Sequence, residues 1–168
     1  MRDNVIMAIG LPTGGMVPDF GLIEMENRVA KFPVEFYRFW LQGFNMPRIS
    51  SFSESSKPVI KQLLDDGFFI ECDESDGNSV FNAIVNLTMY RQGIQKEVTD
   101  EGAIFMIGDS KIEIPKNDIF LHVWQSCTGE TASLIYQKNF EGFMPREYFG
   151  IGVCYLYSQG LLFLSRIT

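Results

Sequence analysis

The chain of 168 residues contains one histidine and three cysteines, and no two cysteines form a CxxC pair. A structural zinc site needs about four cysteine or histidine ligands, usually in closely spaced pairs. His122 and the widely separated Cys72, Cys127 and Cys154 therefore do not predict a metal site. An odd number of cysteines without pairing spacing is typical of small core residues in a reducing compartment. We expect a cytoplasmic protein with no metal and no cofactor.

Long hydrophobic runs are also missing. A helix that crosses a bilayer needs about 20 predominantly apolar residues, whereas the most apolar window, residues 151–164, is shorter and contains glycine and polar residues. The N-terminal segment is interrupted at Gly10 and Pro12, so it lacks the apolar stretch of a signal peptide. These absences predict a chain with no membrane partner.

Basic residues are few, because 14 Lys and Arg stand against 21 Asp and Glu, which gives a net charge of −7. Both halves are acidic, with 7 basic and 12 acidic residues in 1–84, and 7 basic and 9 acidic residues in 85–168. An acidic surface repels the phosphate backbone, so binding to nucleic acid would require a local basic patch. Nucleic acid is therefore a disfavoured partner.

No arrangement of residues predicts catalysis. His122 falls outside the apolar stripe of its predicted helix, which indicates a solvated side chain rather than a general base. Cys127 and Cys154 lie on predicted buried helical faces, where a thiolate nucleophile is disfavoured. The glycine-rich stretch 10–15 lacks the lysine and the following helix of a phosphate-binding loop. We expect a non-enzyme, and an enzyme acting on a small molecule is the least favoured of three function classes.

Aromatic residues, in contrast, are plentiful and make up 14% of the chain. The segments 35–40 and 118–124 each place an aromatic residue four positions before a tryptophan, Trp40 or Trp124. Residues four apart lie on one face of a helix. The two segments are 84 positions apart, and two glycine-plus-apolar runs, which begin at Gly67 and Gly160, are 93 apart. The shared order of elements predicts an internal duplication.

Hydrophobic periodicity and turn residues predict similar elements in the two halves. For the first half we expect a strand at 5–9, a loop at 10–15, a hairpin of 21–25 and 28–32, helices at 33–42 and from Ser55 or Ser56 to Gly67, a strand at 68–72, and a linker or hairpin tip at 73–78. For the second half we expect a strand-like segment at 80–90, a polar loop at 92–102, a hairpin of 103–107 and 111–114, a helix around Phe120 and Trp124, a turn at 128–130, helices at 131–140 and 146–159, and a strand at 161–164.

These elements predict an α+β protein of two tandem winged-helix-like modules, residues 1–76 and 77–168, which pack against one another. A hairpin, a helix, a loop, a short helix, a longer helix and a strand follow one another in the order of a winged-helix domain. In the second half, the segment Trp124-Gln125-Ser126-Cys127-Thr128-Gly129-Glu130-Thr131 joins the first two helices. This half, over residues 111–164, resembles the winged-helix peptide-recognition domains of ribosomal-peptide maturation. The resemblance implies peptide binding. The first half departs from it, since Phe44-Asn45-Met46-Pro47 replaces the Thr-Gly turn.

The helix predicted at 146–159 is apolar nearly all round, which is typical of a helix that is buried on two sides or faces a partner. One stripe contains Phe149, Val153 and Leu156, and the other contains Tyr148, Ile151, Gly152 and Tyr155. We expect the second stripe to pack against the first module. The alternative is that Tyr148, Ile151 and Tyr155 bind a protein, a peptide or a second copy of the chain in a homo-oligomer.

The leading functional hypothesis is a non-catalytic cytoplasmic adaptor or peptide-binding protein, and the alternative is a DNA-binding transcriptional regulator. In a winged-helix DNA reader the recognition helix enters the major groove. The corresponding predicted helices, 57–66 and 146–159, carry few basic residues. For the DNA-binding hypothesis, Arg91 and Lys96 in the second hairpin loop are the candidate contacts to phosphate.

Overall fold

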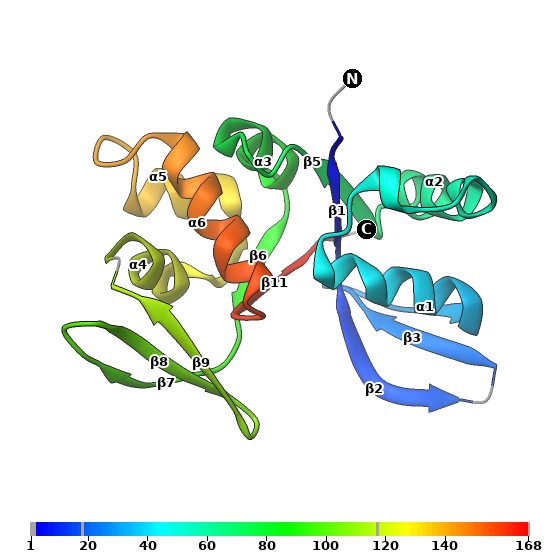
Figure 1. Cartoon of the computed structure of the whole chain (residues 1–168), viewed down its shortest axis with the longest axis horizontal. Coiled ribbons are helices and arrows are strands. Elements are labelled where there is room, and N and C mark those ends of the chain that lie inside the picture. Colours follow the sequence, from blue (N-terminus) through cyan, green and yellow to red (C-terminus); the bar gives the residue numbers. More distant parts are fainter. Residues whose placement is uncertain (1–2, 18, 117, 168) are drawn as a thin grey trace.

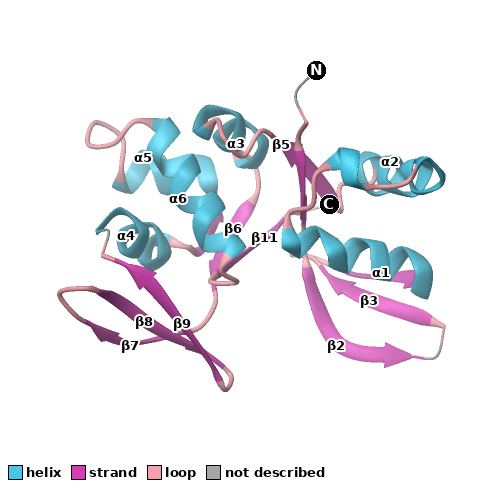
Figure 2. Ribbon diagram, in the orientation of Figure 1, coloured by secondary structure: helices cyan, strands magenta, loops and turns pink. Residues whose placement is uncertain are grey.

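The computed structural model describes residues 3–17, 19–116 and 118–167, and these residues form six α-helices and several small antiparallel sheets (Figures 1 and 2). The α+β class predicted from the sequence is confirmed. Figure 1 shows the two halves side by side, with α6 and β11 of the second half near the place where they meet. None of the described helices is both long and apolar enough to cross a membrane.

The first half combines a two-stranded sheet with a three-stranded meander. β1 (Val5–Ala8) pairs with β5 (Phe69–Cys72), while β2 (Leu11–Val17), β3 (Phe20–Glu24) and β4 (Val29–Pro33) form the meander. Between β4 and β5 the chain forms α1 (Val34–Gln42), short 3-10 turns and α2 (Lys57–Asp65). Both helices begin beside a proline, whose fixed φ suits the first turn of a helix.

The second half repeats this plan with additions. α3 (Gly77–Ile84) precedes β6 (Thr88–Arg91), and β7 (Ile94–Val98), β8 (Gly102–Ile107) and β9 (Ser110–Pro115) form the second meander. There follow α4 (Asp118–Ser126), β10 (Thr128–Thr131), α5 (Ala132–Asn139), α6 (Arg146–Ser158) and β11 (Leu162–Ser165). β6 is the central strand of a sheet in which β10 and β11 are the edges.

The two tryptophans occupy matching places in the two halves. Nε1 of Trp40 donates a hydrogen bond of 3.0 Å to the carbonyl oxygen of Ile9, which follows β1. Nε1 of Trp124 donates a hydrogen bond of 3.0 Å to the carbonyl oxygen of Gln92, which follows β6. Each tryptophan therefore ties its helix to the chain where it leaves the first strand of its half.

The turns before the last strand of each half also match. Gly67 and Gly160 have φ angles of 81° and 75°, a backbone conformation that glycine adopts without steric cost. Directly after Gly67, the carbonyl of Phe68 accepts a hydrogen bond from the amide of Ile9, at 2.9 Å. In the second half, the carbonyl of Leu161, directly after Gly160, accepts a hydrogen bond of 2.7 Å from the amide of Gln92, which follows β6. The same contacts therefore close the strand pairs β1–β5 and β6–β11.

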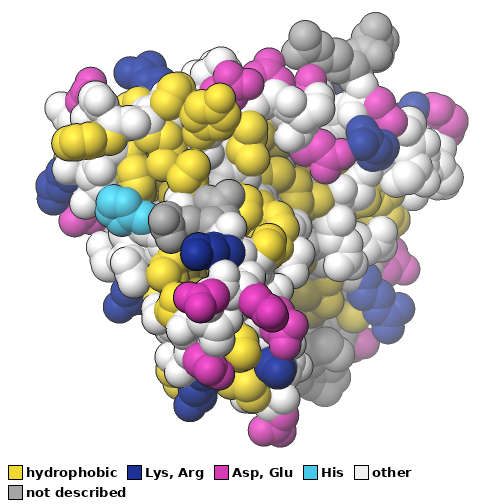
Figure 3. Space-filling view, turned by 60° about the vertical axis from the view of Figure 1, so that its left-hand side comes forward, with side chains coloured by type: hydrophobic (Ala, Val, Ile, Leu, Met, Phe, Trp, Pro, Cys, Tyr) yellow, Lys and Arg dark blue, Asp and Glu magenta, His cyan; other side chains and the backbone are white. Residues whose placement is uncertain are grey.

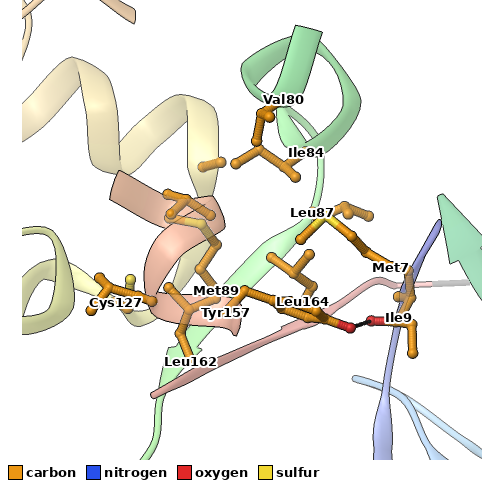
Figure 4. Packing of buried hydrophobic residues seen from close by; sticks show 14 of the residues in the cluster. Met7, Ile9, Val80, Ile84, Leu87, Met89, Cys127, Tyr157, Leu162 and Leu164 are labelled. Carbon is orange, nitrogen blue, oxygen red and sulfur yellow. Dashed lines mark hydrogen bonds between the residues drawn. The ribbon is translucent and has the colours of Figure 1, made fainter. Parts of the chain in front are cut away.

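One hydrophobic core runs through both halves. The buried Tyr157 of α6 donates a hydrogen bond of 3.0 Å to the carbonyl oxygen of Ala8, and its ring stacks on Phe44 with a centroid distance of 6.1 Å. The amide of Gly10 donates to the carbonyl oxygen of Leu164 at 2.7 Å. Figure 4 shows Met7 and Ile9 of the first half beside Leu164 and Tyr157 of the second. The division into modules 1–76 and 77–168 stays a prediction, since this core crosses it.

The segment 80–90 was expected to be strand-like, and this prediction is wrong for its first part. Residues up to Ile84 belong to α3, and only the part from Thr88 is strand. The side chain of Asp76 caps α3 by accepting hydrogen bonds from two backbone amides of its first turn. Val80 and Ile84, four positions apart, then share the buried face of the helix. The polar run before residue 80 is therefore partly a helix cap and first turn.

Three predicted loops or turns contain strands. The glycine-rich stretch 10–15 lies largely in β2, the polar loop 92–102 contains β7, and the turn 128–130 lies in β10. β7 forms an edge of its sheet and exposes most of its side chains, so it has no alternation of apolar and polar residues. β10 pairs with β6 across a register shift, at Thr128 and Thr131. Backbone pairing, rather than side-chain pattern, defines these strands.

Candidate functional site

An apolar surface lies along α6 and the adjacent helix α4. Tyr148 and Ile151 on α6 are 53% and 39% exposed. Tyr155, one turn further along, is half-buried and stacks on Phe120 of α4, with ring centroids 4.4 Å apart. The structure thus brings the three predicted partner-binding residues together and adds Phe120. We call these four residues the α6 face.

The opposite side of α6 is fixed in the core. Phe149, Val153 and Leu156 are fully buried. At Gly150 the helix approaches α3 closely, because a Cβ there would lie 2.1 Å from the carbonyl oxygen of Gly77. Such a contact allows only glycine on α6 without a shift of backbone. The α6 face is therefore displayed by a helix that is rigidly supported from behind.

The expectation that Tyr148 and Tyr155 pack against the first half is wrong. Tyr148 is exposed, and Tyr155 packs on Phe120 of its own half. Tyr157 of α6 does reach the first half, through its hydrogen bond to Ala8. The sequence pattern predicted two apolar stripes on the helix. In the structure α4 covers Tyr155 of the second stripe, whereas Tyr148 and Ile151 remain exposed to solvent.

Figure 3 shows hydrophobic side chains gathered over the upper part of the view, and acidic and basic side chains mainly below and around them. Phe143, in the loop before α6, is a further large apolar side chain in solvent, being 91% exposed. The hydroxyl of Tyr136 donates to the carbonyl oxygen of Met144 at 2.6 Å, which holds the same loop against α5. The loop that carries Phe143 is therefore held against α5.

The candidate phosphate contacts do not form a basic patch of unpaired cations. The guanidinium of Arg91 lies 5.2 Å from the ring centroid of Trp124 and donates to the carbonyl oxygen of Gln125. Lys96 is exposed on β7, next to Glu97. On α2, Lys61 forms an ion pair with Asp65 at 2.6 Å. Arg91 and Lys61 are thus engaged with other groups of the protein, whereas Lys96 is exposed.

The thiols and the histidine show no catalytic geometry in the described residues. Burial raises the pKa of Cys72 and of Cys127 to about 12, and that of Cys154 to about 11. A raised pKa keeps these side chains in the thiol form, which is a poor nucleophile. His122 is exposed and its ring packs against Phe140, with centroids 4.6 Å apart. Within residues 3–17, 19–116 and 118–167, no group of three or more His, Cys, Asp or Glu could hold a metal ion.

A cavity of about 200 Å³ lies between the two halves, and no sequence pattern predicted it. Its walls come from β2 and β3 with the turn after β3, and from β6 and β11. We call it the seam cavity, and its lining residues are Leu11, Glu24, Met25, Glu26, Tyr90, Phe163 and Ser165. No periodicity could have joined residues so far apart in the chain.

A carboxylate with two hydroxyl donors occupies one side of the seam cavity. The hydroxyl of Thr88 donates to Oε1 of Glu26 at 2.6 Å. A hydrogen bond from the Tyr90 hydroxyl to Glu26, together with burial, raises the pKa of Tyr90 to about 12. The ring of Tyr90 stacks on Phe163, with centroids 5.0 Å apart and an angle of 11° between the planes. The cavity therefore combines negative charge with an aromatic wall.

Comparisons of this chain with protein-family models, with curated proteins and with solved structures found no match.

Proposed function

We propose that the protein is a non-catalytic adaptor that binds a peptide or another protein through the α6 face. The observation that carries the proposal is the exposure of Tyr148 and Ile151 beside the stacked pair Tyr155 and Phe120. Contiguous exposed apolar surface is typical of interaction sites, and aromatic residues contribute most to binding energy at such sites. The ligand we propose is a peptide segment with large apolar side chains.

The proposed architecture is that of two tandem winged-helix-like modules, residues 1–76 and 77–168. Its support is the shared order of elements and the matching hydrogen bonds of Trp40 and Trp124. In the second module, α4, β10, α5, α6 and β11 follow one another. The resemblance to peptide-recognition domains concerns this same stretch, so the proposed module and the proposed ligand agree. We further propose that the protein acts in the cytoplasm, where its three free cysteines would stay reduced.

The DNA-binding regulator ranks second among the proposals. Arg91 is engaged with Trp124 and Gln125, and the net charge of −7 opposes approach to a phosphate backbone. Nothing in the contacts of Lys96 distinguishes it from an ordinary exposed lysine on an edge strand. The adaptor proposal requires no such basic surface.

A selection from a random peptide library tests the adaptor proposal. Peptides selected on the wild-type protein are measured by fluorescence anisotropy against the double variant Tyr148→Ser, Ile151→Ser. We expect selected peptides rich in large apolar residues, and affinity for the double variant lower by about tenfold or more, as for other aromatic anchors. Both positions are exposed, so the variant should unfold at the wild-type temperature.

The matched control is Ile94→Ser, Val98→Ser, which removes two exposed apolar side chains (63% and 54% exposed) from β7 instead. This control should bind the peptides as the wild type does. If the selected peptides bind the α6 variant with unchanged affinity, the α6 face is not the docking surface and the proposal fails.

A further inference from the structure

The seam cavity carries an uncompensated negative charge. Glu24 and Glu26 line it, and no ion pair between either of them and a lysine, arginine or histidine occurs in the described chain. The two groups that donate to Glu26, the hydroxyls of Thr88 and Tyr90, are neutral. They orient the carboxylate but leave its charge in place, and none of the lining residues is a cation.

The cavity also has a wall suited to a cation. Tyr90 and Phe163 are neighbours across the β6–β11 pair and stack with ring centroids 5.0 Å apart. The faces of aromatic rings attract cations, and a planar guanidinium can stack on them as well. Tyr90 has Phe163 on one face and Gly129 beside the other, where a Cβ would lie 2.7 Å from the ring, so the face left for such stacking is the outer face of Phe163. The partial burial of the site from water strengthens such electrostatic attraction.

The wall of the cavity also contains a hydroxyl group. Ser165 is only 4% exposed and lines the cavity. Nε of Arg166 is the only enclosed side-chain nitrogen or oxygen without a hydrogen-bond partner in the described ranges, so the unpaired hydroxyl of Ser165 is not enclosed and is open to the cavity. A hydroxyl can accept a hydrogen bond from a ligand N–H. The cavity thus offers acceptors from two carboxylates and one hydroxyl around an aromatic wall.

We propose that the seam cavity binds a guanidinium group, such as the side chain of an arginine residue. A guanidinium has five N–H donors in a fixed plane, which matches several acceptors in different directions better than the compact ammonium of lysine does. Its single charge offsets half of the charge of the two carboxylates, and its plane stacks on the outer face of the Phe163 ring. The site lies apart from the α6 face, so it stands or fails independently of the adaptor proposal.

Nuclear magnetic resonance titration of the full chain tests the site. The probes are N-acetyl-arginine amide, N-acetyl-lysine amide and N-acetyl-citrulline amide, the last being a neutral analogue of arginine of nearly the same shape. We expect the arginine probe to shift the backbone amides of Tyr90, Phe163 and Ser165, the lysine probe to bind more weakly, and the citrulline probe to leave them unchanged. A second titration with the tripeptide Gly-Arg-Gly and with methylguanidine assigns the source, since tighter binding of the tripeptide indicates a peptide arginine and equal binding a small compound.

The variant Glu24→Gln removes one charge from an exposed side chain and should not affect folding. It should weaken binding of the arginine probe by about tenfold, as expected for a lost hydrogen bond to a charged group. The control Glu101→Gln neutralises an exposed carboxylate far from the cavity lining and should bind as the wild type does. The proposal is overturned if citrulline binds as well as arginine, if Glu24→Gln retains full affinity, or if the shifted amides lie outside the seam cavity.

Discussion

Replacement of each tryptophan by phenylalanine compares the same hydrogen bond in two environments. Nε1 of Trp40 and of Trp124 each donate to a backbone carbonyl at 3.0 Å. Phenylalanine keeps a large part of the ring but removes the donor. The carbonyl left behind differs between the two sites, because Ile9 is fully buried whereas Gln92 is half-buried.

The expected loss of stability follows from that difference. A buried carbonyl without a donor costs about 1–3 kcal/mol, and the smaller ring leaves a cavity beside a tryptophan that is itself fully buried. We therefore expect Trp40→Phe to lower the free energy of unfolding by about 2–4 kcal/mol. Water can reach the carbonyl of Gln92, so Trp124→Phe should cost only about 1 kcal/mol. Truncation to alanine removes the whole ring, and it should cost about 3–5 kcal/mol at either site.

Urea denaturation measures both variants, and each retains one tryptophan whose fluorescence reports unfolding. The slope of the free energy against urea concentration should stay the same, which would show that only stability has changed. Equal losses for Trp40→Phe and Trp124→Phe would contradict the argument from burial. A larger loss for Trp124→Phe, or none for either, would show that the two hydrogen bonds do not hold the helices in the way described above.

Three further predictions follow from charges and titrating groups. The pKa of Tyr90 is raised to about 12 in the folded protein, against 10.0 for an ordinary tyrosine, so its stabilising contribution is complete below pH 10 and is lost as the pH rises to 12. The free energy of unfolding, measured in urea across this pH range, should therefore fall more steeply for the wild type than for Tyr90→Phe. Parallel curves for the two proteins would contradict the hydrogen bond from Tyr90 to Glu26. Nε of Arg166 is buried without a hydrogen-bond partner among the described residues, and burial lowers the pKa of this side chain. Arg166→Met should therefore raise the free energy of unfolding by about 1 kcal/mol. A clear loss of stability would instead show that Arg166 makes a stabilising contact. Affinity for duplex DNA at physiological salt should be no better than nonspecific binding, about 10⁻⁴ M or weaker, and sub-micromolar, sequence-dependent binding in a salt titration would favour the regulator instead.

The sequence predicted those elements whose side chains alternate between core and solvent. The helices of Trp40 and Trp124 have apolar residues at helical spacing, and the glycines that precede the last strands mark real turns. β7 was missed because an exposed edge strand such as Ile94–Val98 shows no periodicity. α3 was mistaken for a strand because its apolar run continues through the buried Leu87 to Met89, and Met89 does belong to the strand β6.

The candidate sites were predictable to different degrees. Tyr148, Ile151 and Tyr155 lie on one helix, so local spacing could group them, but only tertiary packing decides which side of α6 faces the core. The seam cavity joins Glu24 and Glu26 to Tyr90 and Ser165, which lie in distant parts of the chain. No local pattern contains that information, because it depends on how β11 is placed against the first half.

The position of β11 in the chain also determines when the interface between the halves can form. Tyr157 contacts Ala8 across 149 residues, and Leu164 accepts its hydrogen bond from Gly10. Proteins are synthesised from the N-terminus, and closing long loops slows folding. The β1–β5 pair can form once Cys72 has been made. A nascent chain that still lacks β11 exposes the apolar residues at the C-terminal end of β1 and leaves one edge of β6 unpaired. During synthesis the protein therefore passes through a stage in which β1 is already paired with β5, while its apolar residues that later contact the second half are still exposed. The synthesis of β11, a strand of four residues, ends that exposure.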